Sequence, residues 1–242
     1  MTALISAELL RLRTVRSPRY GALGLLALTG LLAAAPLIDP GSARQAPGQL
    51  TDQLTMLIVP VLLVLGAGAA HYVAADFKRG TAAMTYLAVP TRARVTAAQV
   101  LTWASLCFVL AGAAATLIVG LELTAAAENH VKSGLSALDL AQLIGGSAFS
   151  GAFLGSAGVL AAIITRNPTI AVTALVGLNV VEGTLITPHV RGIAPYLPFK
   201  LLEPAMGLTH AVPSLVAIGL LLAYLAAFGV AVHKWALARD LT

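Results

Sequence analysis

Long apolar runs alternate with short polar segments along most of this chain. Each run is nearly free of charge and is about 20 residues long or longer, enough to cross a hydrocarbon core of about 30 Å as an α-helix. The pattern predicts six membrane-spanning helices, at approximately 20–38, 54–74, 96–120, 138–165, 169–187 and 212–233. We therefore expect an all-α integral membrane protein in which residues 1–242 form a single transmembrane domain.

The composition supports a membrane protein. Of the 242 residues, 58% are hydrophobic and 10% are charged, whereas soluble domains carry roughly 25% charged residues. The formal net charge is +5. Because the basic residues flank the apolar runs, this charge indicates membrane orientation and contact with anionic lipid rather than nucleic-acid binding. A single cysteine, Cys107, leaves no possibility of an internal disulfide.

Lysine and arginine are distributed unequally between the two predicted sides of the membrane. With a cytoplasmic N-terminus and six alternating spans, eleven basic residues lie inside and four lie outside. The inner residues are Arg11, Arg13, Arg16, Arg19, Lys78, Arg79, Arg92, Arg94, Arg166, Lys234 and Arg239, and the outer ones are Arg44, Lys132, Arg191 and Lys200. This bias predicts that both termini are cytoplasmic.

Residues 1–19 combine leucines with charged side chains such as Glu8 and Arg11. The mixture predicts a short amphipathic (elbow) helix in the inner membrane interface. The alternative is a basic flank that only fixes orientation. We interpret the apolar run that follows, 20–38, as a retained span, because it is longer than the apolar core of a signal peptide.

Between the second and third runs lies the charged segment DFKRGTAAMTYLAVPTRARV, residues 76–95. At helical spacing Phe77, Met84 and Leu87 fall on one face, and Pro90 ends the run because proline cannot continue a helix. Two interpretations remain open. The segment is either a short cytoplasmic amphipathic helix over 76–90 or a solvated loop that carries orienting charges.

The same segment resembles the intracellular loop of type-2 ATP-binding-cassette (ABC) permeases. That loop carries Glu-x-x-x-Gly-Thr, an apolar stretch, a proline and a basic residue before the third span. The matching residues here are Gly80, Thr81, Pro90 and Arg92. Asp76 replaces the usual Glu, and Gln99 stands where Lys is frequent. The stretches ITRNPTIAV, APYLPF and ALARDLT resemble the later loops and the tail of the family.

The resemblance implies a membrane-spanning permease subunit of an exporter in a bacterial plasma membrane. Its coupling helix would dock on a separate cytoplasmic ATPase subunit, present in two copies, which binds ATP and magnesium. The implied docking residues are Asp76, Phe77, Lys78, Arg79, Gly80, Thr81, Met84, Leu87, Pro90 and Arg92. A second permease subunit, an identical or similar chain, would complete the complex. The cargo would be an amphipathic small molecule, a peptide or a lipid.

The chain itself carries no catalytic motif. It contains no G-x-x-x-x-G-K-[ST] phosphate loop, no H-E-x-x-H, no G-x-S-x-G and no Cys/His cluster at metal-binding spacing. We therefore expect neither an enzyme nor a cofactor in this subunit.

Polar groups inside the predicted spans are few. Glu182 is the only carboxylate well inside one of them, with Asn179 on the same helical face. It serves either as a contact in the translocation pathway or its gate, or as a structural carboxylate. Ser147, Gly151 and Gly155 form a small-residue stripe that lets another helix approach, within the subunit or between subunits.

The long proline-rich segment between the fifth and sixth spans resembles the short re-entrant helices of the same family. The alternative is an ordinary surface loop. Two other functions also remain open for the whole chain. A secondary carrier or channel normally shows repeated halves and several intramembrane ionisable residues, which are not evident here. A non-transporting scaffold that recruits an ATPase would share the docking helix.

Overall fold

The chain folds into a bundle of long helices, seen here in a computed structural model that describes residues 6–8, 10–11, 16–34, 49–82, 85, 91–128, 135–190, 192–209 and 211–235. All regular secondary structure in these ranges is helical, so the all-α prediction is confirmed. The helices are α2 (Arg16–Ala33), α4 (Gln49–Lys78), α6 (Arg92–Glu128), α7 (Ala137–Thr165), α8 (Pro168–Val181), η1 (Glu182–Ile186), α9 (Thr187–His189), η2 (Ala194–Tyr196), α10 (Leu202–Ala205) and α11 (Ser214–Trp235).

Five stretches of helix among the described residues are long and apolar enough to cross a membrane. They are Gln53–Lys78, Arg92–Glu128, Ala137–Thr165, Pro168–His189 and Ser214–Lys234. They correspond to the second to sixth predicted spans. The first predicted span, 20–38, overlaps α2, which has 18 residues and is not among the five. About 20 apolar residues are needed for a span, and residues 35–38 lie outside the described ranges.

The third span is longer than its apolar run predicts. The run was expected to end near residue 120, but α6 continues to Glu128 because the segment LELTAAAE is rich in strong helix formers. Glu122 therefore lies inside the helix, and only 3% of its surface is exposed. Glu122 is thus a second buried carboxylate, beside Glu182, on a helix apolar enough to cross a membrane.

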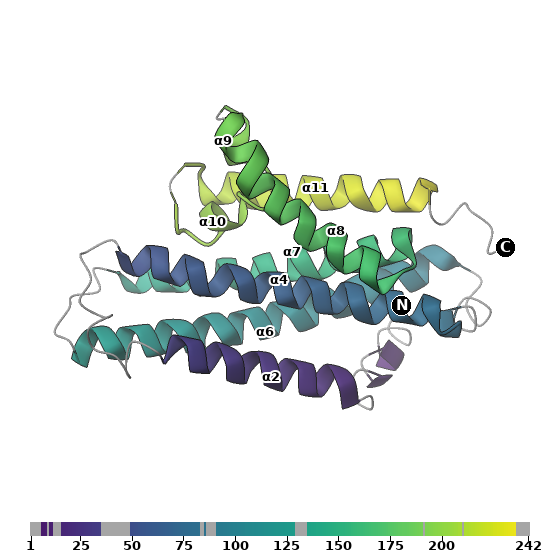
Figure 1. Ribbon diagram of the computed structural model, residues 1–242, viewed down its shortest axis with the longest axis horizontal. Coiled ribbons are helices and arrows are strands. Elements are labelled where there is room, and N and C mark those ends of the chain that lie inside the picture. The colour runs from purple at the N-terminus through teal and green to yellow at the C-terminus, as the bar shows by residue number, and fades with distance from the viewer. Residues whose placement is uncertain are drawn as a thin grey trace.

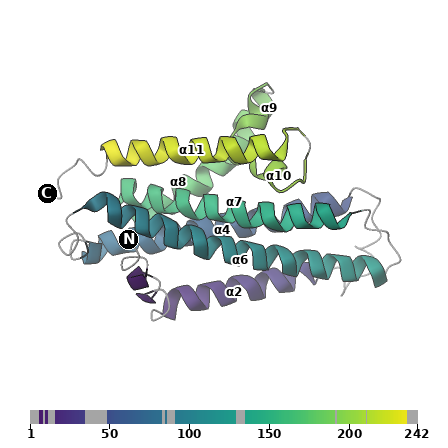
Figure 2. The same cartoon turned by 180° about the vertical axis from the view of Figure 1, so that it is seen from behind.

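The long helices alternate in direction. The C-terminal ends of α4, α7 and α11 lie at the same end of the molecule as the N-terminal ends of α6 and α8 (Figures 1 and 2). The described residues of the N-terminal segment, 6–8 and 10–11, lie at this end as well (Figure 1). These are the helix ends that carry Lys78, Arg92, Arg166 and Lys234. The arrangement is the one that the charge bias requires, with these basic residues on a single side.

Helix α7 is the centre of the bundle. It packs against α6, α4, α8, α11 and the short α10, and α4 and α6 flank it along most of its length (Figure 1). In its most apolar stretch 72% of the residues are buried, compared with 17% in α8 and 17% in α11. Helices α8 and α11 therefore leave most of their apolar surface uncovered by the described chain.

Small residues allow the neighbouring helices to approach α7 closely. A methyl group added at Gly151 would lie 2.8 Å from the backbone oxygen of Cys107, and one added at Gly155 would lie 2.7 Å from the Cys107 sulfur. Gly158 faces the backbone of Gly66 on α4 in the same way. The stripe that includes Gly151 and Gly155 therefore packs within the subunit, against α6. Its third member, Ser147, is fully buried and donates its hydroxyl to the Leu143 carbonyl at 2.7 Å.

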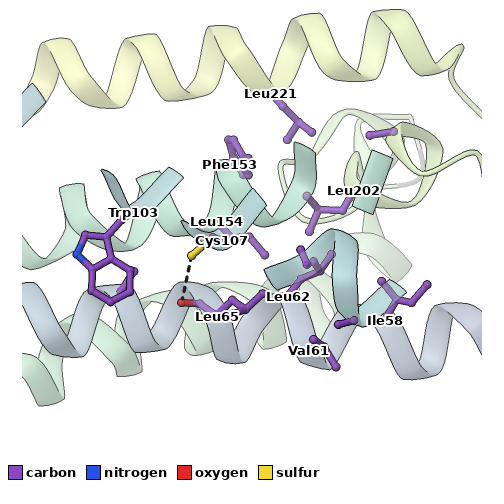
Figure 3. Packing of buried hydrophobic residues seen from close by; sticks show 14 of the residues in the cluster. Ile58, Val61, Leu62, Leu65, Trp103, Cys107, Phe153, Leu154, Leu202 and Leu221 are labelled. Carbon is purple, nitrogen blue, oxygen red and sulfur yellow. Dashed lines mark hydrogen bonds between the residues drawn. The ribbon is translucent and has the colours of Figure 1, made fainter. Parts of the chain in front are cut away.

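The apolar core fills the space around these contacts. Figure 3 shows side chains of α4, α6 and α7 meeting those of α10 and α11, with Leu154 and Leu202 buried between the helices. The Cys107 thiol lies against α4, 4.0 Å from the Leu65 carbonyl (Figure 3). A buried thiol behaves as a small hydrophobic group, so the single cysteine is part of the core.

The helix ends of α7 and α8 follow from local sequence. Ser136 and Asp139 form a capping box at the start of α7. At its other end Arg166 adopts a left-handed backbone with φ of 50°. Asn167 then caps α8 by accepting from the Thr169 amide at 3.0 Å, and Pro168 follows at the first helical position. The motif TRNP therefore encodes a tight turn between two antiparallel helices.

We expect Gly151→Val to destabilise the fold, because the added side chain collides with α6. Overpacking of this kind costs about 1–3 kcal/mol. Gly145→Val on the same helix is the matched control, since a Cβ at Gly145 meets no atom within 4 Å. Unfolding of the detergent-solubilised protein by SDS, followed by circular dichroism, measures the difference. Equal stability of the two variants would contradict the close approach of α7 and α6.

Candidate functional site

The end of α4 forms a sharp corner built by the motif Asp76-x-x-x-Gly80-Thr81. The helix ends at Lys78, and Gly80 then turns the chain with a φ of 75°, a left-handed conformation that favours glycine. The Thr81 hydroxyl lies 3.3 Å from both the backbone and the side-chain oxygen of Asp76. The acid, the glycine and the threonine thus have a shared structural role, which is to fold the chain back onto the last turn of α4.

Asp76 points into the protein. Its residue surface is 4% exposed, and its Oδ1 atom accepts a hydrogen bond from the Arg11 guanidinium. Arg11 lies 65 positions away in sequence, in the N-terminal segment. The pair therefore joins the N-terminal segment to the corner of α4.

Two aromatic rings extend this connection into the bundle. The Arg11 guanidinium carbon lies 5.2 Å from the centre of the Tyr72 ring, a cation–π distance. The Tyr72 ring in turn lies 5.2 Å from that of Trp103 on α6, with the planes tilted by 55°. A single row of contacts therefore runs from Arg11 through α4 to α6.

Electrostatics favour the ionised form of Arg11. Its hydrogen bond to Asp76 raises the pKa of the Arg11 guanidinium above the ordinary value, although burial opposes the shift. Glu8 lies 3.8 Å from the same guanidinium. Burial raises the pKa of the Glu8 carboxyl, and Arg11 offsets part of that increase. One arginine therefore faces two carboxylates.

The predicted docking residues are divided between the interior and the surface. Phe77 is half-buried and packs on the apolar core. Lys78, Arg79, Gly80 and Thr81 are exposed. Arg92 begins α6 and is half-buried. The remaining members, Met84, Leu87 and Pro90, lie outside the described residues.

Sequence patterns did not reveal the partners of Asp76. Arg11 was grouped with the basic residues that orient the chain, and Tyr72 and Trp103 lie in apolar runs where aromatic side chains are common. Pairing across 65 positions leaves no local signal. The only hint was chemical, because an acid at the end of an apolar helix requires a partner when it is buried.

At the opposite end of the molecule Glu182 fastens the segment that follows α8. It is 5% exposed, and its Oε1 accepts the Lys200 backbone N–H at 2.6 Å. Helix α8 widens at this point into the π-helical turn η1, where the Thr187 hydroxyl donates to the Glu182 carbonyl at 2.7 Å. Asn179 is half-buried one turn earlier. The carboxylate therefore has a structural bond, to the Lys200 amide.

The segment between α8 and α11 folds back onto the bundle. It contains the short helices α9, η2 and α10 (Figure 2). Leu201, Leu202 and Met206 are fully buried, and Gly146 of α7 lies directly against the backbone of Ala205. Short helices thus lie between α8 and α11, and α10 is part of the core.

Comparison with protein-family models, with curated proteins and with solved structures gave no match for this chain. The family resemblance therefore rests on the motifs of the chain itself.

We expect Asp76→Asn and Arg11→Leu each to destabilise the protein. Removing one member of a fully buried pair lowers the free energy of unfolding by about 3–5 kcal/mol. The side chain of Arg11 is 32% exposed. Because water reaches this partner, we expect each variant to lose about 1–2 kcal/mol. The stability loss of the double variant should be about 1 kcal/mol smaller than the sum of the losses of the two single variants. SDS unfolding of the four proteins measures the coupling, with the exposed Arg79→Leu as control. Strictly additive losses would exclude the pair.

We expect Glu182→Leu to release the Lys200 amide from protection against hydrogen exchange. A hydrogen bond to a charged acceptor contributes about 1.5–3 kcal/mol, so exchange should accelerate at least about tenfold. Glu182→Gln keeps an acceptor oxygen and should show a smaller effect. Glu203→Gln is the control, because Glu203 contacts Lys200 through its side chain only, at 2.8 Å. Unchanged exchange in Glu182→Leu would contradict the fastening role.

Proposed function

We propose that this chain is the membrane-spanning permease subunit of an ATP-driven ABC exporter. In this proposal α2 is the first of six spans, residues 1–19 form the interfacial helix, and the corner after α4 opens the coupling helix. Two ATPase subunits, which bind ATP and magnesium, dock beneath two permease subunits in a bacterial plasma membrane. Both termini face the cytoplasm, and the cargo is an amphipathic small molecule, a peptide or a lipid.

The observation that carries the proposal is the corner at Asp76. Its acid is buried and bonded to Arg11, while the adjacent Lys78 and Arg79 are exposed. A site that passes motion from a partner to a membrane helix needs an exposed contact surface on a rigid support, because a flexible loop would absorb the displacement. The corner has both properties and is continuous with the 30 residues of α4.

The proposal assigns different roles to residues that the motif groups together. Lys78 and Arg79 face the ATPase and select its orientation by charge. Asp76, Gly80 and Thr81 hold the corner in shape. Phe77 packs on the core of its own subunit, and so it anchors the corner instead of filling a cleft on the partner.

The exposed faces of α8 and α11 support a subunit that pairs within the membrane. Only 17% of the most apolar stretch of each is buried by the described chain. By analogy with the family, the second and fifth spans, α4 and α8, line the pathway between two subunits. Asn179 and Glu182 then lie near its outer end, where the Glu182 bond to Lys200 holds the re-entrant segment in place.

We expect the chain to copurify with a cytoplasmic ABC ATPase encoded nearby. The double substitution Lys78→Glu/Arg79→Glu should weaken that association at least about tenfold, because it places like charges opposite each other. Arg94→Glu, also exposed and on the same predicted side, should retain it. Binding of the purified ATPase to the permease in nanodiscs measures the affinities.

The same complex distinguishes transport from a scaffold role. A permease should move an amphipathic dye or lipid in ATP-loaded vesicles, whereas a scaffold would bind the ATPase without moving a substrate. If the purified chain binds no candidate ATPase, the permease proposal is wrong.

A further inference from the structure

A second feature of the same end of the molecule is a cavity of about 330 Å³. It lies between the N-terminal segment, the corner after α4 and the first turns of α6. Its polar walls come from Glu8, Arg11, Thr81, Thr85 and Gln99, and the remaining walls are apolar. Thr81 is exposed, so the cavity can be reached from outside the bundle.

Two hydrogen-bond acceptors in this cavity lack a partner. Gln99 Oε1 and Glu8 Oε1 are both buried and accept no hydrogen bond from the residues that the structure describes. Gln99 is only 9% exposed, and the 3.8 Å contact between Glu8 and Arg11 is too long to be a hydrogen bond. A buried polar group without a partner costs about 1–3 kcal/mol. Two unpaired acceptors in one cavity indicate a ligand that brings N–H donors.

Two charged residues, Glu8 and Arg11, line the cavity. Glu8 and Asp76 are two carboxylates, and Arg11, the basic residue between them, is bonded to Asp76. An anion would be repelled by Glu8, whereas a primary ammonium could donate to both Glu8 and Gln99.

The position of the cavity identifies the source of such an ammonium group. The charge bias places this end at the inner face of the membrane, and residues 6–11 belong to the predicted interfacial helix. The polar headgroups of the inner leaflet lie at this depth. We infer that the cavity between Glu8, Arg11 and Gln99 binds the primary ammonium headgroup of an inner-leaflet phospholipid such as phosphatidylethanolamine.

Binding would connect lipid composition to the corner of α4. A bound headgroup would bridge the N-terminal segment and α6 beside the Arg11–Asp76 pair, so the corner would be most rigid with its lipid in place. The inference depends on the membrane orientation but not on the ATPase, and it can hold if the permease proposal fails.

Trp103 is a natural reporter because it follows Gln99 by one helical turn on α6 and belongs to the row of contacts that leads to Arg11. The Trp235→Phe variant leaves Trp103 as the single tryptophan. It is reconstituted in vesicles of equal phosphatidylethanolamine and phosphatidylcholine, with brominated acyl chains on one lipid or the other. Because the bulk composition is unchanged, the difference in quenching measures which headgroup is bound next to the protein.

We expect brominated phosphatidylethanolamine to quench Trp103 more strongly, with an association constant about tenfold higher than that of phosphatidylcholine, the ratio that one charged hydrogen bond provides. Gln99→Leu and Glu8→Gln should each remove most of the preference. Gln142→Leu, an exposed glutamine on α7, should keep it. If the site binds a lipid headgroup, millimolar ethanolamine should reduce the preference for phosphatidylethanolamine only weakly. If the site binds a soluble amine, millimolar ethanolamine should abolish that preference.

Equal quenching by the two lipids would overturn the inference. So would a preference that survives in both Gln99→Leu and Glu8→Gln, or a stronger preference for brominated phosphatidylglycerol, which would identify an anion site. Should Gln99→Leu fail to fold, Glu8→Gln decides alone, because Glu8 is outside the helical core.

Discussion

The close approach of α7 to its neighbours is the constraint on which the rest of the fold depends. Inside a membrane, lipid chains cover an apolar helix face as well as another helix does, so burial of apolar surface gives little reason for helices to associate. Helix association therefore depends on tight van der Waals contact between the helices. Gly151 and Gly155 against Cys107, and Gly158 against Gly66, supply that contact on two sides of α7. Helices α4 and α6 are positioned by these glycines, and the corner at Asp76 and the cavity beside Gln99 stand on the helices so positioned.

Polar bonds then fasten the two ends of the bundle. At one end Asp76 holds Arg11, and at the other Glu182 holds the Lys200 amide. Both acids are buried at the end of a helix, and each bonds to a segment that lies apart from that helix in the sequence. Such bonds are strong where water is scarce, because an unpaired carboxylate there is costly. The packing of α7 thus determines how the helices are arranged, and the two acids attach the segments at its two ends.

Sequence patterns predicted the helical class, the second to sixth apolar helices and the turn at Asn167, because each depends on residues close together in the chain. They also indicated that the Gly151 stripe is a packing surface. They could not show that this surface meets α6, that Asp76 meets Arg11 or that Gln99 faces a cavity, since these contacts join distant segments. The length of α6 was misjudged for another reason. The predicted span ended at residue 120, before Glu122, although glutamate is a good helix former and its burial depends on neighbours that no pattern reveals.

The burial of Asp76 changes what the corner after α4 can do. If this acid were exposed, the segment would be a charged loop that could contact a partner but not transmit displacement. Bonded to Arg11 and to the Thr81 hydroxyl, it connects the corner to two separate segments. A force applied at Lys78 or Arg79 therefore acts on α4 and on the N-terminal segment together, and through the Tyr72–Trp103 contact it reaches α6. The buried acid, the glycine turn and the arginine hold the corner in shape, whereas Lys78 and Arg79 are exposed.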